Sequence, residues 1–150
     1  MVATINSISG SKLPASGINK AGVYEIPFDC SVDNMASGDI FKLVALKKGL
    51  DIVGSKIMID TGEASVTLDL GHSTTGAAND DLVDGGSAAT SGTLLLGDGT
   101  TGATGASYTA LYPIAIEADT YLTMTIGGAA ADTLKGRVLL AVNDLSGDND

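Results

Sequence analysis

The chain has 150 residues, a formal net charge of −10 and no tryptophan, and only 4% of its residues are aromatic. This length fits one domain with a real core, and so acidic a chain without a basic stripe excludes nucleic acid and disfavours anionic membranes as partners. Hydrophobic residues make up 44% of the chain, but many of them are alanine. Since aromatic residues are also few, the core must be built mainly of Ile, Val and Leu, as in a β-sandwich.

The charge is unevenly distributed. All eight basic residues lie outside residues 57–134. The eight acidic residues outside that span balance them, so the whole net charge of −10 comes from the middle of the chain. One interpretation is a solvated acidic surface. The alternative is an acidic face turned to the medium while the charge-balanced remainder touches a partner.

Nothing at the start of the chain is typical of a secretory signal. MVATINSISGSKLPASG has neither a basic region nor a continuous apolar region. No segment approaches the roughly 20 apolar residues that span a bilayer, and the single Cys30 cannot form an intrachain disulfide. We expect a protein made in a reducing cytoplasm, with no membrane partner.

Residues 1–20 are predicted to form an extended N-terminal arm. Its apolar residues Ile5, Ile8 and Leu13 have a spacing that fits neither a sustained helix nor a clean strand. The arm is either a frayed terminus or a segment that packs on a neighbour. Residues 21–145 are predicted to form a single β domain that begins with a strand at 22–28, and residues 146–150 a short acidic tail.

The stretch DIFKLVALKKGLDIVGSKIMIDTGEASVTLDLG (39–71) is predicted to form a meander of three strands, at 40–46, 50–60 and 64–70. A polar turn of hairpin length with a glycine joins each pair, and Gly54 indicates a bulge. The first strand is apolar on both faces, with Ile40, Val44 and Leu46 expected on one face. Such a strand must be covered on both sides, by a second sheet, a loop or another subunit.

Residues 72–107 are rich in glycine, alanine, serine and threonine, and we predict a long excursion over the surface. One helical turn is expected at 79–84, and Leu94, Leu95 and Leu96 form the strongly apolar point. Further strands are predicted at 108–116, 120–126 and 135–142. The fold class is therefore all-β, an antiparallel β-sandwich or jelly-roll-like barrel with a long Gly/Ala-rich loop.

The residues indicate no catalytic chemistry, no cofactor and no metal. His72 is the only histidine, and its setting predicts a polar loop residue. Cys30 has no basic neighbour and is expected to be an inert thiol, buried or half-buried. Asp80, Asp81 and Asp84 lack the spacing of an EF-hand loop, and the GDG at 97–99 has no calcium-binding repeat. We expect a protein that is not an enzyme.

Several segments in this order resemble the capsid decoration, or cement, proteins of tailed bacteriophages. They are AGVYEIPF, DIFKLVALKKGLDIVGSKIMIDTG, SVTLDLG, a Gly/Ala/Asp-rich excursion, EADTYLTMTIGGA and LKGRVLLAVNDL, which together cover roughly 21–145. The resemblance implies a non-enzymatic virion protein on the outer surface of the capsid. It also implies the major capsid protein and its own copies, as a homotrimer, as partners.

Within that interpretation, Ile5, Ile8 and Leu13 are the candidate capsid contacts, together with the charge-balanced part of the domain. Candidate subunit-interface residues are Ile40, Val44, Leu46, Leu94, Leu95 and Leu96. The main alternative is an adhesion or carbohydrate-binding module of a phage fibre or appendage. It would use residues 72–107 as its binding loop, with Tyr108 and Tyr112 as the nearby aromatic residues.

Overall fold

The computed structural model describes residues 4–5, 17–18, 20–32, 34–75, 82–96 and 114–144. These residues form strands and no helix, so no helix in this part of the chain is able to cross a membrane. The strands are β1 (Thr4–Ile5), β2 (Gly22–Asp29), β3 (Ile40–Leu46), β4 (Asp51–Thr61), β5 (Thr67–Ser73), β6 (Val83–Ser87), β7 (Leu94–Leu96), β8 (Ile114–Ala115), β9 (Thr120–Gly127) and β10 (Lys135–Asn143).

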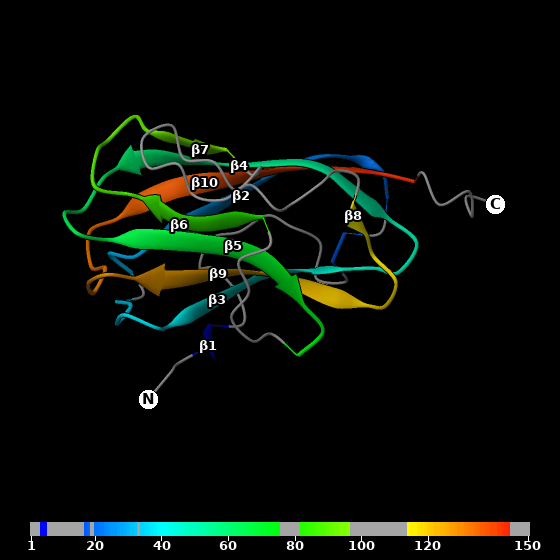
Figure 1. The fold of residues 1–150 in the computed structure, drawn as a ribbon, viewed down its shortest axis with the longest axis horizontal. Coiled ribbons are helices and arrows are strands. Elements are labelled where there is room, and N and C mark those ends of the chain that lie inside the picture. The colour runs from blue at the N-terminus through cyan, green and yellow to red at the C-terminus, as the bar shows by residue number, and fades with distance from the viewer. Residues whose placement is uncertain are drawn as a thin grey trace.

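The strands form two sheets that pack face to face (Figure 1). Sheet A has the order β1-β3-β9-β5-β6, and sheet B has the order β2-β10-β4-β7, with β8 also paired to β4. Among the described strands every pair is antiparallel except β1 with β3. The predicted all-β antiparallel sandwich is therefore confirmed.

The core lies between the sheets and is mostly aliphatic, as the composition predicted. Alternate positions of each strand face inward, because side chains in a strand point to opposite faces in turn. Phe28 of β2 and Phe41 of β3 bridge the sheets, with ring centroids 6.4 Å apart. Around them pack fully buried side chains that include Ile26, Ile57, Ile59, Leu68, Leu70, Leu122, Met124, Ile126, Val138 and Leu140.

The predicted meander at 39–71 is wrong in its pairing. β3 and β5 lie in sheet A and β4 lies in sheet B, so both connections pass from one sheet to the other. The turn at 47–49 has the polar residues and the positive φ of Gly49 that a hairpin also uses. These features fix a reversal of the chain, but they do not fix which strand becomes the partner.

β3 also differs from simple alternation. Phe41 pairs with Met124 and Val44 with Leu122, so a bulge at Leu43 shifts the register by one residue. Phe41, Val44 and Leu46 therefore share the core side, whereas Ile40 lies on the outer face opposite Thr125. The predicted grouping of Ile40 with Val44 and Leu46 is wrong for this reason.

The excursion after β5 contains more regular structure than predicted. The helical turn expected at 79–84 is wrong where the structure describes it, because Val83 begins β6 and pairs with Leu70. Leu82 and Val83 are fully buried and anchor this edge strand. β7 pairs with β4 through Leu94, Leu95 and Leu96. Asp80, Asp81 and residues 97–113 lie outside the described residues.

Other boundaries move by a few residues. The strand predicted at 64–70 is displaced toward the C-terminus, since β5 covers Thr67–Ser73, and β8 is the described part of the strand predicted at 108–116. The expected bulge beside Gly54 is confirmed by a register shift of β4 against Ala141 and Val142. Cys30 is fully buried, as one of the two alternatives predicted.

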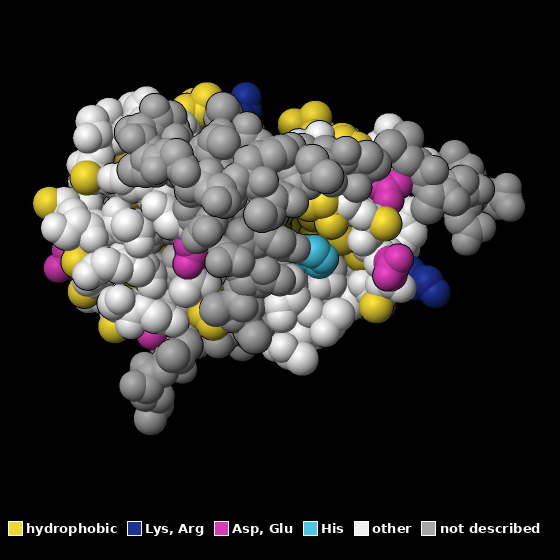
Figure 2. Space-filling model, in the orientation of Figure 1, with side chains coloured by type: hydrophobic (Ala, Val, Ile, Leu, Met, Phe, Trp, Pro, Cys, Tyr) yellow, Lys and Arg dark blue, Asp and Glu magenta, His cyan; other side chains and the backbone are white. Residues whose placement is uncertain are grey.

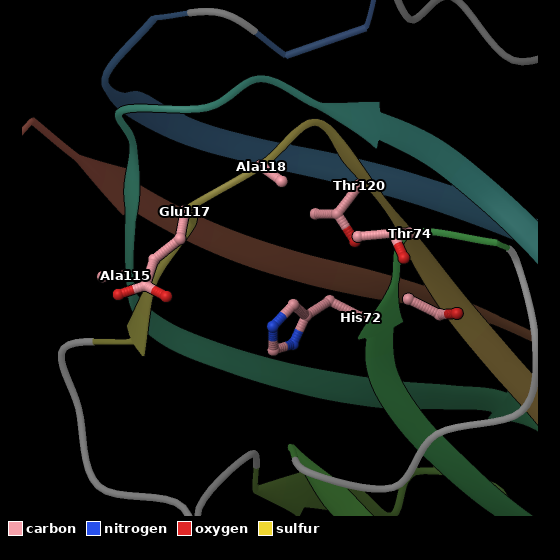
Figure 3. A pocket seen from close by; sticks show the side chains of 7 residues that line it. His72, Thr74, Ala115, Glu117, Ala118 and Thr120 are labelled. Carbon is pink, nitrogen blue, oxygen red and sulfur yellow. The ribbon is translucent and has the colours of Figure 1, made fainter.

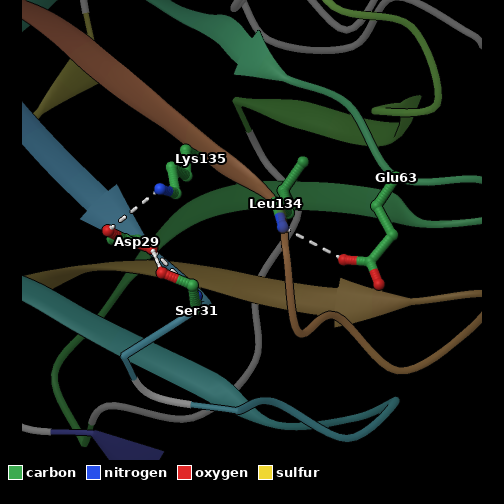
Figure 4. A network of polar contacts seen from close by, with 5 residues as sticks. All are labelled: Asp29, Ser31, Glu63, Leu134 and Lys135. Carbon is green, nitrogen blue, oxygen red and sulfur yellow. Dashed lines mark hydrogen bonds and ion pairs between the residues drawn. The ribbon is translucent and has the colours of Figure 1, made fainter.

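Glu63 ties two turns together at one end of the sandwich. Its Oε2 accepts hydrogen bonds from the backbone N–H groups of Asp132, Thr133 and Leu134, at 2.9, 3.0 and 3.1 Å. Figure 4 shows the bond to Leu134 and, nearby, the ion pair of Asp29 with Lys135. The β4–β5 turn is therefore fastened to the β9–β10 turn by one carboxylate.

These contacts shift two pKa values in opposite directions. Burial alone would raise the pKa of Glu63, but the N–H groups of Thr133, Asp132 and Leu134 outweigh it and hold that pKa below its ordinary value. A hydrogen bond to Glu63 and the negative charge of Glu63 raise the pKa of Asp132. The two carboxyl groups thus titrate as a pair.

We expect Glu63→Gln to lower the free energy of unfolding at neutral pH by about 1–2 kcal/mol, because an amide oxygen accepts these bonds more weakly than a carboxylate. Since the folded pKa of Glu63 is lowered, its contribution is complete above the unfolded pKa and is lost as pH falls through the folded value. Denaturant melts across the acid range should therefore show a shallower acid-side loss in this variant.

Asp132→Asn is the counterpart. The raised folded pKa of Asp132 gives a contribution that is present below the unfolded pKa and lost as pH rises, so this variant should be the more stable protein at neutral pH. Glu117→Gln, at an exposed carboxylate, serves as the control. A Glu63→Gln variant that melts like the control across the pH range would contradict the role of Glu63.

A second prediction concerns the close packing of β10. A Cβ at Gly136 would lie 2.7 Å from the Phe28 ring and closer still to the Met58 carbonyl oxygen. We expect Gly136→Ala to destabilise the fold by about 1–3 kcal/mol through overpacking. Gly54→Ala is the matched control, because its nearest contact would be an ordinary 3.8 Å to Ala141. Equal thermal midpoints for the two variants would contradict this packing.

Candidate functional site

The core-facing side of sheet A ends in polar side chains. Along β5 the core-facing positions are Leu68, Leu70 and His72, each paired with a buried residue of β9. Along β9 the same face begins with Thr120, which is 3% exposed. A polar side chain at a core-facing position costs free energy unless it finds a partner. His72 and Thr120 therefore mark this end of the sandwich as a candidate site.

A cavity of about 470 Å³ opens at this end, and we call it the His72 pocket. Its walls come from β5 and the turn after it, from β9, and from β8 with the loop that follows. Figure 3 shows the His72 ring pointing into the space between these segments. The lining residues are His72, Ser73, Thr74, Ala115, Glu117, Ala118 and Thr120.

Two groups in the His72 pocket are available for a ligand. The Thr120 hydroxyl is buried and has no hydrogen-bond partner within the described residues. The Glu117 side chain is exposed, and no Lys or Arg of the described segments forms an ion pair with it. The neighbouring Asp119 is already engaged, with Lys47 Nζ at 3.8 Å and the Lys48 N–H at 3.0 Å.

Sequence reasoning placed His72 in a polar loop, and that prediction is wrong because β5 continues to Ser73. It missed Thr120 and Glu117. Thr120 had a readable signal, since the alternation of Leu122, Met124 and Ile126 extends back to it on the same face. Glu117 had none, because β8 reaches the pocket through pairing with the distant β4.

A second candidate surface is the outer face of sheet B. Of the four exposed large hydrophobic side chains in the described chain, three belong to its strands: Val23 at 76%, Leu94 at 43% and Val53 at 36%. A shallow groove of about 360 Å³ lies on this face, and its lining includes Val23, Lys56 and Leu139. Figure 2 shows hydrophobic side chains next to a basic one along the margin that sheet B forms.

The charges on this face are nearly balanced. Arg137 lies between Glu25, at 3.6 Å, and Asp60, at 3.3 Å, and Lys135 lies 3.9 Å from Asp29. Asp60 and then Glu25 raise the pKa of Arg137. Lys56 is exposed at the edge of the groove, and among the described residues it has no ion-pair partner. Paired charges around exposed apolar groups are typical of protein-contact surfaces.

The residues predicted for a subunit interface are mostly buried within the chain itself. The exposed fractions are 5% for Ile40, 7% for Val44, 0% for Leu46 and 1% for Leu95. Leu94 is the one that presents a large exposed surface, at 43%, and the side chain of Leu96 lies outside the description. Their role between subunits stays a prediction.

The predicted capsid contacts lie in the arm. Ile5 belongs to β1 and pairs with Phe41 through the backbone, while Ile8 and Leu13 lie outside the described residues. In the part of the chain that the structure describes, no group of three or more His, Cys, Asp or Glu side chains has the arrangement of a metal site. The side chain of Asp84 is outside that part.

The fold is similar to that of a chain in the solved structure of the capsid of Ralstonia phage GP4. The TM-score is 0.61 at 16% identity, over 96% of this chain and 98% of that chain. At this identity the likeness shows a shared fold. Protein-family models and curated proteins give no match to the sequence.

Two further capsid structures show a weaker likeness. The acidic stable capsid of Helicobacter pylori bacteriophage KHP30 contains a chain with a TM-score of 0.48 and 12% identity, over 83% of this chain and 87% of that chain. The capsid asymmetric unit of cyanophage Pam1 contains one with a TM-score of 0.43 and 21% identity, over 89% and 92%.

The different burial of two neighbours on β7 makes a prediction. Leu95→Glu should unfold the protein, because it places a charge in the core opposite Ile57. Leu94→Glu should keep the fold, and if Leu94 lies between subunits it should lower the oligomeric mass in multi-angle light scattering. A Leu94→Glu protein that is folded and has the unchanged oligomeric mass would remove Leu94 from the interface.

Proposed function

We propose that this chain is a structural protein of a phage virion, which binds the outer surface of the capsid and stabilises the shell without catalysing a reaction. The observation that carries the proposal is the fold likeness to a chain of the GP4 capsid, which extends over 96% of this chain and 98% of that one. The family resemblance of the segments from AGVYEIPF to LKGRVLLAVNDL supports the narrower role of a decoration protein.

The outer face of sheet B is the surface that best fits contact with the shell. It combines the exposed Val23 and Val53 with paired charges, so docking buries apolar area and leaves few buried charges without a partner. Lys56 supplies one basic group for a carboxylate of the major capsid protein. The arm, with Ile5, Ile8 and Leu13, is a separate candidate capsid contact in our proposal, because Thr4 and Ile5 pair with β3 at the edge of sheet A.

The acidic residues of the middle of the chain that lie outside sheet B then face the medium in this proposal. A surface of one sign is soluble and does not attract DNA. Association of copies as a homotrimer is part of the same proposal, with Leu94 and its neighbours on β7 as candidate contacts. These assignments explain why the charge-balanced residues and the exposed apolar residues occur on the same sheet.

A carbohydrate-binding module is the alternative, and the His72 pocket is the observation that favours it. The cavity of about 470 Å³ has several hydroxyl groups, and pockets of this size bury small ligands. None of its described lining residues is Phe, Tyr or Trp, however, and Tyr108 and Tyr112 lie outside the described residues. A stacking platform for a sugar ring is therefore missing from this lining, and the structural role is the better supported.

The test is binding of the purified protein to shells of its own phage that lack it. We expect saturable co-sedimentation and a higher melting temperature of the decorated shells. Val23→Glu should reduce binding at least tenfold, because it puts a charge into a desolvated apolar contact. Wild-type protein that does not bind these shells would refute the proposed function.

Val32→Glu is the matched control. Val32 is 59% exposed and lies in the turn after β2, so it is not part of a strand of sheet B. It receives the same chemical change and should bind like the wild type. If the wild type binds and the two variants bind equally well, the outer face of sheet B is not the contact, while the virion role stands.

A further inference from the structure

All described residues that line the His72 pocket come from the acidic part of the chain. Its lining residues fall within 72–120, inside the span 57–134 that contains no Lys or Arg and supplies the net charge of −10. No described Lys or Arg lines it, and the nearby Lys47 is paired with Asp119 at 3.8 Å. Glu117 is the one carboxylate among the described lining residues, and its negative charge favours a cation over an anion.

The polar groups of the pocket are hydrogen-bond acceptors placed on different elements. The Glu117 carboxylate lies on the β8 side and the Thr120 hydroxyl on β9, and Figure 3 shows both bordering the space beside the His72 ring. Thr120 is 3% exposed, and within the described chain its Oγ1 has no partner. A buried hydroxyl without a partner gains free energy when a ligand N–H reaches it.

We propose that the His72 pocket binds an organic cation through a primary ammonium or guanidinium group, with Glu117 as the counter-ion and the Thr120 hydroxyl as a hydrogen-bond acceptor. The methyl groups of Ala115 and Ala118 contact the aliphatic part of the ligand. This site is separate from the proposed shell contact, so it stands whether or not the chain is a decoration protein.

The donors and the size of the pocket exclude other ligand classes. A metal ion needs several carboxylate, imidazole or thiolate ligands, and the lining offers one carboxylate and one imidazole. A phosphate or carboxylate ligand would meet Glu117 and no basic partner. The volume of about 470 Å³ admits a diamine or the end of a lysine or arginine side chain.

The test follows backbone amide signals by NMR while putrescine is titrated, with 1,4-butanediol as the neutral comparison of the same carbon length. Putrescine should shift signals of residues 115–120 and 72–74 at millimolar concentration, and the diol should not. Equal shifts with the diol would overturn the proposal, because charge would then play no part. Absence of shifts with every cation tested would also overturn it.

Variants distinguish a built site from general attraction to an acidic protein. Glu117→Gln should weaken putrescine binding at least tenfold, and the isosteric Thr120→Val by several-fold. Glu25→Gln removes one negative charge from sheet B and should leave the affinity unchanged. If Glu25→Gln and Glu117→Gln weaken binding equally, the cation binds only through the net charge, and the proposed site is wrong.

The source of the cation is settled by two further ligands, N-acetyl-lysine amide and N-acetyl-arginine amide. Tighter binding of putrescine assigns the pocket to a free diamine. Tighter binding of a capped amino acid assigns it to a basic side chain of another protein. Either order of these affinities supports the proposal, provided that Glu117→Gln abolishes the preference of the pocket for the cation over the neutral diol.

Discussion

The register of β9 between β3 and β5 is the constraint on which most of the structure depends. β9 is the central strand of sheet A, and its pairs place Leu122, Met124 and Ile126 on the core side. Each neighbour must present its apolar positions opposite these residues, because a shift of one residue turns a whole apolar set outward. β5 does so by plain alternation and β3 by a bulge. Where the apolar series of β9 stops at Thr120, the core stops and the His72 pocket begins.

The strands were predictable wherever alternation is strong, as in β5, β9 and β10, because a half-buried strand has apolar residues on one face and polar residues on the other. Their partners were not, since the polar turn at 47–49 looks the same in a hairpin and in a connection between sheets. β6 carries two glycines and one large apolar residue, and it is a strand because it lies against β5. The pocket is formed by residues that are far apart in the sequence. Of the two residues that sequence reasoning missed, Thr120 could have been predicted from the alternation of β9, whereas Glu117 could not.

The uneven charge along the sequence corresponds in part to a division in space, although Lys42 lies on β3 of sheet A and Lys47 pairs with Asp119 near the His72 pocket. The basic residues Lys56, Lys135 and Arg137 all lie on sheet B, where Lys135 and Arg137 of β10 form ion pairs with acidic neighbours. The described lining of the His72 pocket, by contrast, comes from the acidic span. One small sandwich thus offers an apolar, charge-balanced face suited to a protein and a cavity with one carboxylate suited to a cation. The two sites do not share a lining residue.

The N-terminal residues have a consequence for how the arm can be studied. Thr4 pairs with Ile40, and Ile18 bonds to Ala45 and Lys47, with its N–H 2.7 Å from the Ala45 carbonyl oxygen. The segment thereby occupies the free edge of β3, the most apolar strand of sheet A. A protein shortened at this end would expose the unpaired backbone groups of an apolar edge strand. Such an edge is the usual template for edge-to-edge aggregation. Point changes in the arm are thus a cleaner probe of its contacts than truncation.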